Sequence, residues 1–396
     1  MKKALSALSA ALAAASLTAS VTVEKSSHAV TFTAKTAGVA AGDTLEFFAV
    51  GPLSDHDYET FLVTDDSPAA IAKAMDEASV PRGMSPDPFK AVLWPEGPRV
   101  KVEARLKGGE FKPASFWIAD GAPPEEGGGA ILVADSRWTG GKRDGSGAPI
   151  ADSEMPCAVW ALYNHAPSLM QLDGVLEQSV TYGRFSPKST FERGTEMEVR
   201  ISWDGASSAV RKTVRIGKDA NLKAVIESLR GDPAGAKGDL YVDLAFEDGV
   251  PLSEAAVAAK AFSLLDGPSL KMNGRAKGEF FFCAFLPEDG WRDRPGRIFQ
   301  PFEVHVAPDG TRKFVYIEED WSGEGLDPVL KPRETAISDW SELTGLIKAS
   351  GAAAEKITVM FIFAPASMPV SGLKPVLANV PGHVSTFYVF QTGEVR

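Results

Sequence analysis

Alternating hydrophobic and polar positions recur along the chain and predict β-strands joined by short turns. Residues 100–106 and 302–306 alternate in this way, and each run leads through a glycine-containing turn, at 107–109 and 308–310, into a second alternating run. A period of two on both sides of a glycine turn is typical of a β-hairpin. We therefore predict two hairpins at these places. Shorter strands are predicted over residues 31–33, 45–50 and 58–64.

Two segments have the features of helices. Ser67 and Pro68 open one through residue 78, with a small polar cap before a proline in the first turn. The second, predicted over 253–265 with Ser253 as its cap, is rich in alanine, which suits close packing on a sheet. Strands outnumber helices and hairpins join many of them. The pattern predicts an α+β fold with largely antiparallel sheets.

The two halves of the chain repeat one order of elements. "YETFLVTDDSPAAIAKAM" from Tyr58 resembles "YVDLAFEDGVPLSEAAVAAKAF" from Tyr241, and residues 89–121 and 157–185 have counterparts at 281–321 and 357–390. Insertions in loops would explain the drifting offset. We predict an internal duplication into two related domains, 21–205 and 206–396. Each should be a largely antiparallel sheet with hairpins and one or two packed helices.

Length and composition are those of a globular protein, and the N-terminus has the residue pattern of a targeting signal. The 396 residues suffice for about two domains, and 44% hydrophobic and 23% charged residues are ordinary values. Lys2 and Lys3 precede an uncharged, alanine-rich run and then small residues, the order of a secretory signal peptide. Residues 1–20 are predicted to be that signal. No later run is long enough for a transmembrane helix, so we expect a periplasmic or secreted protein without an integral membrane segment after signal removal.

The charge and cysteine content narrow the classes of partner. The formal net charge is −11, which disfavours nucleic acid and anionic membranes as partners. Protein or glycan partners remain open. Cys157 and Cys283 could form one disulfide or stay as buried thiols in their apolar runs. Two cysteines exclude a four-thiolate cluster in one chain, and no cofactor is predicted.

The first unit resembles the YdjY-type domain family of exported bacterial proteins. The likeness is clearest over residues 28–165 and rests on Glu46, the Tyr58-Glu59 pair with its following helix, and the Trp138-Thr139-Gly140 turn. The family's Trp-Thr-Gly-Ser turn reads Trp-Thr-Gly-Gly here, and the second unit has Tyr241-Val242 in place of Tyr58-Glu59. The resemblance implies an exported domain and supplies no catalytic residues.

The sharpest polar cluster is Asp55, His56, Asp57 and Glu59. Carboxylates around an imidazole could bind a divalent metal or orient a general base. Adjacent residues of an extended segment point to opposite faces, so only a subset can converge. A solvated hairpin loop explains the same residues without chemistry, and no metal site is predicted.

A glycine-rich segment, residues 136–149, is a second candidate. Lys142 and Arg143 lie beside glycines whose backbone amides could form an anion-binding concavity, although a surface loop is the commoner structure for such a segment. Trp138 is predicted to anchor it against the domain core.

Tryptophans form the last group of candidates. Trp291, Trp321 and Trp340 lie among charges and turns, where they could stack on sugars or anchor a protein, or pack under loops. Trp117 and Trp160, in apolar runs, are predicted core residues.

No nucleophile or metalloprotease motif is present in the sequence. We therefore expect a non-enzymatic binding or scaffold protein with an unknown protein or glycan ligand, contacted by Trp138, Lys142, Arg143, Trp291 and Trp321. The alternative is a hydrolase with a carboxylate and histidine site at residues 55–59.

Overall fold

The computed structural model describes most of the chain. It covers residues 21–86, 94–121, 136–143, 150–151, 157–174, 178–206, 209–272, 302–320, 329–351, 357, 359–384 and 386–392. The predicted signal peptide, Cys283, Trp291 and Trp321 lie outside these ranges. Among the described residues, no helix has both the length and the apolar character needed to cross a bilayer.

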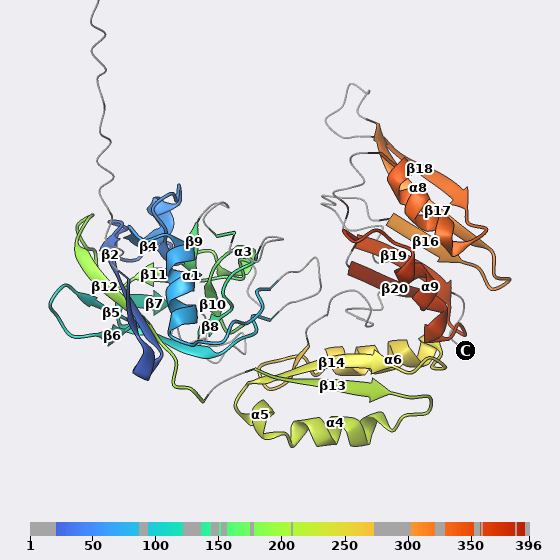
Figure 1. Cartoon of the computed structure of the whole chain (residues 1–396), viewed down its shortest axis with the longest axis horizontal. Coiled ribbons are helices and arrows are strands. Elements are labelled where there is room, and N and C mark those ends of the chain that lie inside the picture. Colours follow the sequence, from blue (N-terminus) through green and yellow to red (C-terminus); the bar gives the residue numbers. More distant parts are fainter. Residues whose placement is uncertain are drawn as a thin grey trace, which may run out of the picture.

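Eight strands of the first unit close into a barrel (Figure 1). They are β2 (Ala29–Thr36), β3 (Phe47–Val50), β4 (Thr60–Thr64), β5 (Arg99–Leu106), β8 (Ser136–Trp138), β9 (Ala158–Ala161), β10 (Met170–Leu172) and β12 (Glu196–Ser202). Their order is β2-β12-β5-β8-β10-β9-β3-β4, and β4 pairs back with β2. The pairs β3–β4 and β9–β10 are parallel, whereas the others are antiparallel.

The closed barrel corrects the sheet that the sequence predicted. Closure depends on β4 pairing with both β3 and β2, and its residue Val63 lies opposite Val50 on one side and Lys35 on the other. Local alternation predicts strands but carries no information on which distant strand completes the ring.

Shorter elements surround the barrel. The strands are β1 (Thr22–Glu24), β6 (Lys112–Pro113), β7 (Ile118–Asp120) and β11 (Phe185–Pro187), and the helices are η1 (Lys25–Ser27), η2 (Asp57–Glu59), α1 (Pro68–Glu77), α2 (Ala114–Trp117) and α3 (Gln178–Thr181). Helix α1 begins as predicted, because the Ser67 side chain accepts a hydrogen bond from the backbone N of Ala70 at 3.2 Å.

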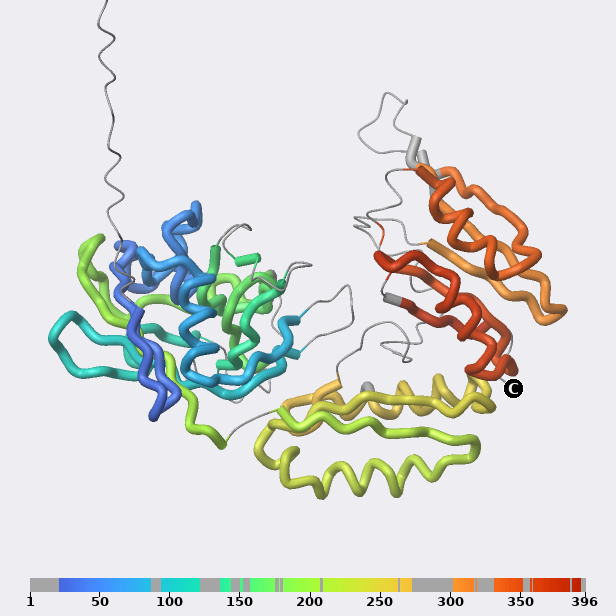
Figure 2. The backbone as a smooth tube through the Cα atoms, viewed as in Figure 1, coloured from blue at the N-terminus to red at the C-terminus, as the bar shows by residue number. Residues whose placement is uncertain are grey.

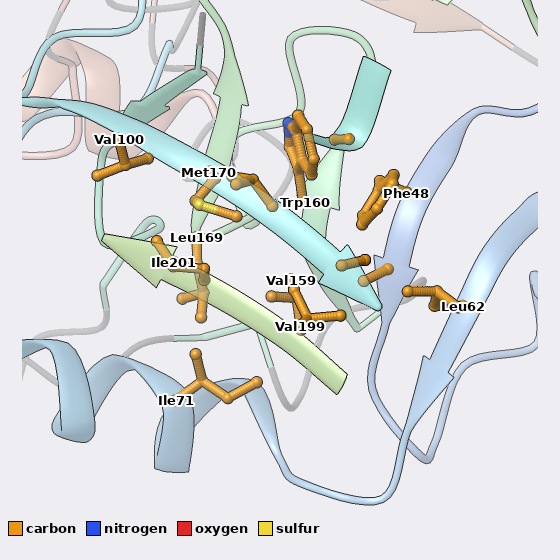
Figure 3. Packing of buried hydrophobic residues seen from close by; sticks show 14 of the residues in the cluster. Phe48, Leu62, Ile71, Val100, Val159, Trp160, Leu169, Met170, Val199 and Ile201 are labelled. Carbon is orange, nitrogen blue, oxygen red and sulfur yellow. The ribbon is translucent and has the colours of Figure 1, made fainter. Parts of the chain in front are cut away.

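The barrel core forms from one face of each alternating strand. Val199 and Ile201 of β12 point inward, while Glu198 and Arg200, which alternate with them, lie outside the core. Phe48 and Trp160 pack with ring centroids 4.6 Å apart, and Ile71 of α1 joins the same cluster (Figure 3). The predicted core residues Trp117 and Trp160 are both buried.

The second unit contains two sheets that share one hydrophobic core. A three-stranded parallel sheet consists of β13 (Val210–Ile216), β14 (Leu240–Phe246) and β15 (Lys271–Met272). It is accompanied by α4 (Leu222–Arg230), α5 (Pro233–Ala236) and α6 (Leu252–Ser263). Helix α6 is capped by Pro251, so the predicted cap Ser253 lies within the helix.

The other sheet has five strands in the order β18-β17-β16-β19-β20. Their bounds are β16 (Phe302–Val306), β17 (Arg312–Asp320), β18 (Val329–Ala336), β19 (Val359–Pro365) and β20 (Thr386–Thr392). The helices between them are η5 (Trp340–Glu342), α8 (Leu343–Ala349), η7 (Val370–Leu373) and α9 (Lys374–Ala378). Figure 2 follows the chain from the barrel through the three-stranded sheet to this one. β16–β19 and β19–β20 are parallel, which corrects the antiparallel prediction for this unit.

The structure does not show the predicted duplication. The strand after Tyr58, β4, closes a barrel, whereas the strand that contains Tyr241, β14, is the centre of a parallel sheet. Both strands lead into a helix, α1 or α6, and both predicted hairpins exist as β5–β6 and β16–β17. The likeness in sequence therefore corresponds to similar local elements set in different sheets.

Candidate functional site

A row of outward-facing positions crosses the wall of the barrel. Strand register places side chains of neighbouring strands opposite one another on the same face. The row runs from β5 to β4 through Arg99, Arg137, Gln171, Ala161, Phe47 and Thr60. An ionic cluster lies at the Arg99 end and a cluster of carboxylates, imidazoles and aromatic rings at the Phe47 end.

The second cluster contains part of the predicted 55–59 site. His56 Nδ1 contacts Glu59 Oε1, and its Nε2 lies 3.4 Å from Asp55 Oδ1. Asp57 instead contacts the Arg193 guanidinium. Because η2 turns the chain here, His56 and Glu59 converge and Asp57 does not. The expectation that only a subset of the four would converge is therefore confirmed.

Glu46 joins this pair through backbone pairing. The backbone N of Glu46 donates to the backbone O of Glu59 at 2.9 Å. The backbone O of Glu46 accepts from the backbone N of Leu162, also at 2.9 Å. Gln178 Nε2 of α3 donates to both Glu46 carboxylate oxygens, at 2.9 and 2.7 Å. Burial raises the pKa of Glu46, the nearby Glu59 charge adds to the rise, and Gln178 and His56 oppose it. The sequence singled out Glu46 only through the family resemblance.

Aromatic rings gather around the carboxylates. The Phe47 centroid lies 5.7 Å from that of His56, 5.6 Å from Tyr163 and 6.2 Å from His165. Burial and the neighbouring His56 lower the pKa of His165 to about 4, so this imidazole is neutral at neutral pH. Its Nδ1 lies 2.8 Å from Ser168 Oγ, and Ser168 is fully buried. Tyr163 and His165 carried no sequence signal for this site.

Arg137 lies at the centre of the ionic cluster. It lies in the segment 136–149, for which a surface loop was the commoner expectation, but it belongs to β8 and is fully buried. Its Nη2 lies 2.9 Å from Asp173 Oδ2 and its Nη1 lies 2.8 Å from Asp239 Oδ1. The carbonyls of Gly97 and Gly238 accept further hydrogen bonds from it, at 2.9 and 2.7 Å. The loop prediction failed here because pairing with β5 and β10 makes this short segment a barrel strand.

The same cluster connects the barrel to the three-stranded sheet. Lys271 of β15 contacts Asp173 of the barrel, and its ammonium lies over the rings of Trp94 and Tyr241, at 5.3 and 5.1 Å. Burial and Arg137 lower the pKa of Lys271 to about 8, against the opposing effect of Asp173. The cluster pairs its cations with carboxylates of both units, and we assign it a structural role.

The other predicted ligand residues are placed apart from the carboxylates. Trp138 is fully buried in the barrel core, as predicted for an anchor, so it does not face a ligand, contrary to the other prediction for it. Lys142 is exposed, and Arg143 donates to Gly140 O at 3.3 Å. Burial and the nearby Arg82 charge lower the pKa of Arg143. Residues 144–149 lie outside the described ranges, so the anion-binding loop stays a prediction.

Trp340, the third tryptophan predicted to lie among charges, packs against the core of the second unit. Its ring is partly buried there and lies 4.8 Å below the Arg312 guanidinium.

A groove of about 510 Å³ opens elsewhere on the barrel, beside β5 and β12. Its lining includes three basic side chains. Lys101 and Arg200 both contact the buried carboxylate of Glu103, and Arg99 contacts Asp173 and Asp239. Because these cations are already paired, the groove offers a weaker basis for ligand binding than the carboxylate cluster.

Comparisons of the chain with models of protein families, with curated proteins and with solved structures give no match. Within the described ranges, no group of three or more His, Cys, Asp or Glu side chains is arranged to hold a metal ion.

Proposed function

We propose that the protein is a non-enzymatic binding or scaffold module that binds its ligand on the outer wall of the barrel, at Glu46, His56 and Glu59. The convergence of these three side chains with Tyr163 on one face of the wall carries the proposal. Burial shifts the pKa of Glu46, Tyr163 and His165 here, and shifted pKa values gather at functional sites.

Binding is favoured over catalysis because the polar side chains of the site form hydrogen bonds and ion pairs with one another. Glu59 contacts His56, both oxygens of Glu46 accept from Gln178, and Ser54 Oγ accepts from the His56 backbone N at 3.1 Å. Ser168, the hydroxyl beside His165, is fully buried and cannot meet a substrate. Preorganised groups of this kind suit recognition.

A hydrolase is the second candidate, and one observation favours it. Glu46, whose pKa burial raises, lies next to a His56–Glu59 pair in which the carboxylate orients the imidazole. Such an acid and base could activate a water molecule.

A turnover assay separates the two candidates. The full chain should hydrolyse ester, peptide and glycoside substrates no faster than a His56→Ala variant. Asp57→Asn is the matched control, because Asp57 lies in the same segment but contacts Arg193. Hydrolysis that is lost in His56→Ala and kept in Asp57→Asn would establish the enzyme and refute the binding module.

Export is a separate part of the proposal. The basic, apolar and small-residue order of residues 1–20 and the resemblance to the YdjY-type family support a periplasmic or secreted protein. The mass of the protein isolated from the periplasm or medium of a bacterial host should correspond to loss of about 20 residues. A full-length chain retained in the cytoplasm would contradict export.

A further inference from the structure

Buried carboxylates in the barrel and the adjoining sheet are commonly matched by a guanidinium or ammonium group. Five of them contact arginine or lysine side chains: Glu103, Asp173, Asp232, Asp239 and Asp243. Among the described residues, Glu46 and Glu59 have no such partner. Their polar side-chain neighbours are Gln178, His56 and Tyr58. A buried carboxylate without a cation is costly, so the site is short of positive charge.

Tyr163 gives a second, independent sign of a missing partner. Its side chain is nine-tenths buried, and no described residue forms a hydrogen bond with its hydroxyl. The pKa of this hydroxyl is raised by burial and then by the charges of Glu46 and Glu59, which places the group beside both carboxylates. A tyrosine whose side chain is largely buried normally has a hydrogen-bond partner for its hydroxyl.

The rings and the exposure of the site define the shape of the missing group. Tyr58 is 66% exposed and stacks on His56 at 5.7 Å, whereas the side chain of Glu59 is 12% exposed and Glu46 is 5% exposed. The site therefore leads from an exposed ring to buried carboxylates. Aromatic faces next to carboxylates attract organic cations.

We infer that this site binds an organic ammonium group, which reaches Glu59 and Glu46 past the ring of Tyr58. This inference rests on the proposed binding function and names its ligand class. An ammonium nitrogen would donate to the carboxylates and to Tyr163, while its alkyl chain lies against the exposed ring of Tyr58. The net charge of −11 favours the approach of such a ligand. The group can come from a lysine side chain of a protein or from a free polyamine.

Titration calorimetry of the full chain tests the inference with matched probes. Nα-acetyl-lysine methylamide and spermidine represent the two sources, and Nα-acetyl-norleucine methylamide is the neutral analogue. We expect the analogue to bind at least about 10-fold more weakly than the lysine probe. Preference for spermidine would identify a polyamine, whereas preference for the lysine probe would identify a protein ligand.

Variants locate the binding. Glu59→Gln should weaken binding of the lysine probe at least about 10-fold, whereas Asp57→Asn should change it less than about twofold. Tyr58→Leu alters an exposed side chain, so folding is not at risk, and the lost cation–π contact should weaken binding about twofold to fivefold. Melting temperatures show whether each variant is folded.

Three results would overturn the inference: equal binding of the neutral analogue, undiminished binding by both Glu59→Gln and Tyr58→Leu, or no binding of either ammonium probe at about 10 mM. If a neutral glycan or acidic peptide binds instead and Glu59→Gln abolishes it, the binding module stands and only the cation assignment fails. Hydrolysis that depends on His56 would refute the proposed function itself.

Discussion

Glu46 illustrates how distant residues set the chemistry of one side chain. It precedes the apolar strand β3, yet its neighbours Glu59 and Gln178 lie 13 and 132 positions further along the chain. The sequence detected the 55–59 segment because its polar residues are contiguous. It could not detect Glu46, Tyr163 or His165 as partners, because only the folded barrel brings them together.

The buried Glu46 carboxylate should destabilise the fold at neutral pH. Burial raises the pKa of Glu46 above its ordinary value of 4.5. Above the folded pKa the buried carboxylate is charged, and unfolding is favoured because it returns this charge to water. Glu46→Gln keeps a polar partner for Gln178 and should increase the free energy of unfolding at pH 7. Urea denaturation at several pH values should show this gain shrinking as the pH falls through the folded pKa and vanishing below about 4.5. A gain that grows toward low pH would contradict the assignment.

Trp138 should contribute strongly to stability. Its indole is fully buried among barrel side chains. Trp138→Ala should lower the free energy of unfolding by about 3–5 kcal/mol, through lost burial and the cavity left behind. Lys142→Ala, four residues away and exposed, should change it by less than about 0.5 kcal/mol. Equal effects of the two substitutions in chemical denaturation would show that Trp138 is not a core anchor.

At the scale of elements, the sequence predicted correctly those features that depend only on neighbouring residues. The cap at Ser67 and the hairpin turn at 107–109 were predicted because cap and turn residues act within a few positions. Barrel closure was missed because it depends on the pairing of β4 with β2, whose residues lie about 30 positions apart, such as Ala34 and Thr64. The predicted duplication is not shown for a related reason, since similar strand–helix pairs can enter different sheets.

Hydrogen exchange tests the closure of the barrel. Amides of β4 should be protected to nearly the global unfolding limit, because β3 and β2 flank this strand on both sides. Amides of β18, an exposed edge strand, should exchange faster. If the β4 amides exchange as fast as those of β18, the ring is open between β4 and β2.

At the scale of the whole molecule, the ionic cluster joins the barrel to the second unit. Tyr241 OH donates to Pro95 O at 2.6 Å, and Arg211 contacts Glu96, so further polar contacts accompany Arg137 and Lys271. None of these pairings was visible in the sequence, because charged residues in strands are normally read as solvent-facing. Here the outward-facing charged side chains of the barrel, such as Arg137 and Asp173, are buried against the second unit.

Asp173→Asn should weaken this interface. Asp173 contacts Arg99, Arg137 and Lys271, and its neutralisation leaves buried cations with fewer carboxylates. We expect the free energy of unfolding to fall by about 3–5 kcal/mol. The exposed pair Lys107–Glu196 provides a control, since Glu196→Gln should cost far less than Asp173→Asn in the same denaturation experiment. Similar losses in both variants would mean that the cluster adds no special stability.

The central claim is that the outer barrel wall around Glu46 and Glu59 binds a ligand, and the chain contains its own probes for it. His56 and His165 lie in the cluster, while His28, His305 and His383 lie elsewhere. In ¹H–¹³C spectra of the imidazoles, the lysine probe should shift the His56 and His165 signals and leave the other three unmoved. Shifts confined to His28, His305 or His383, or no shift at saturating probe, would contradict the claim.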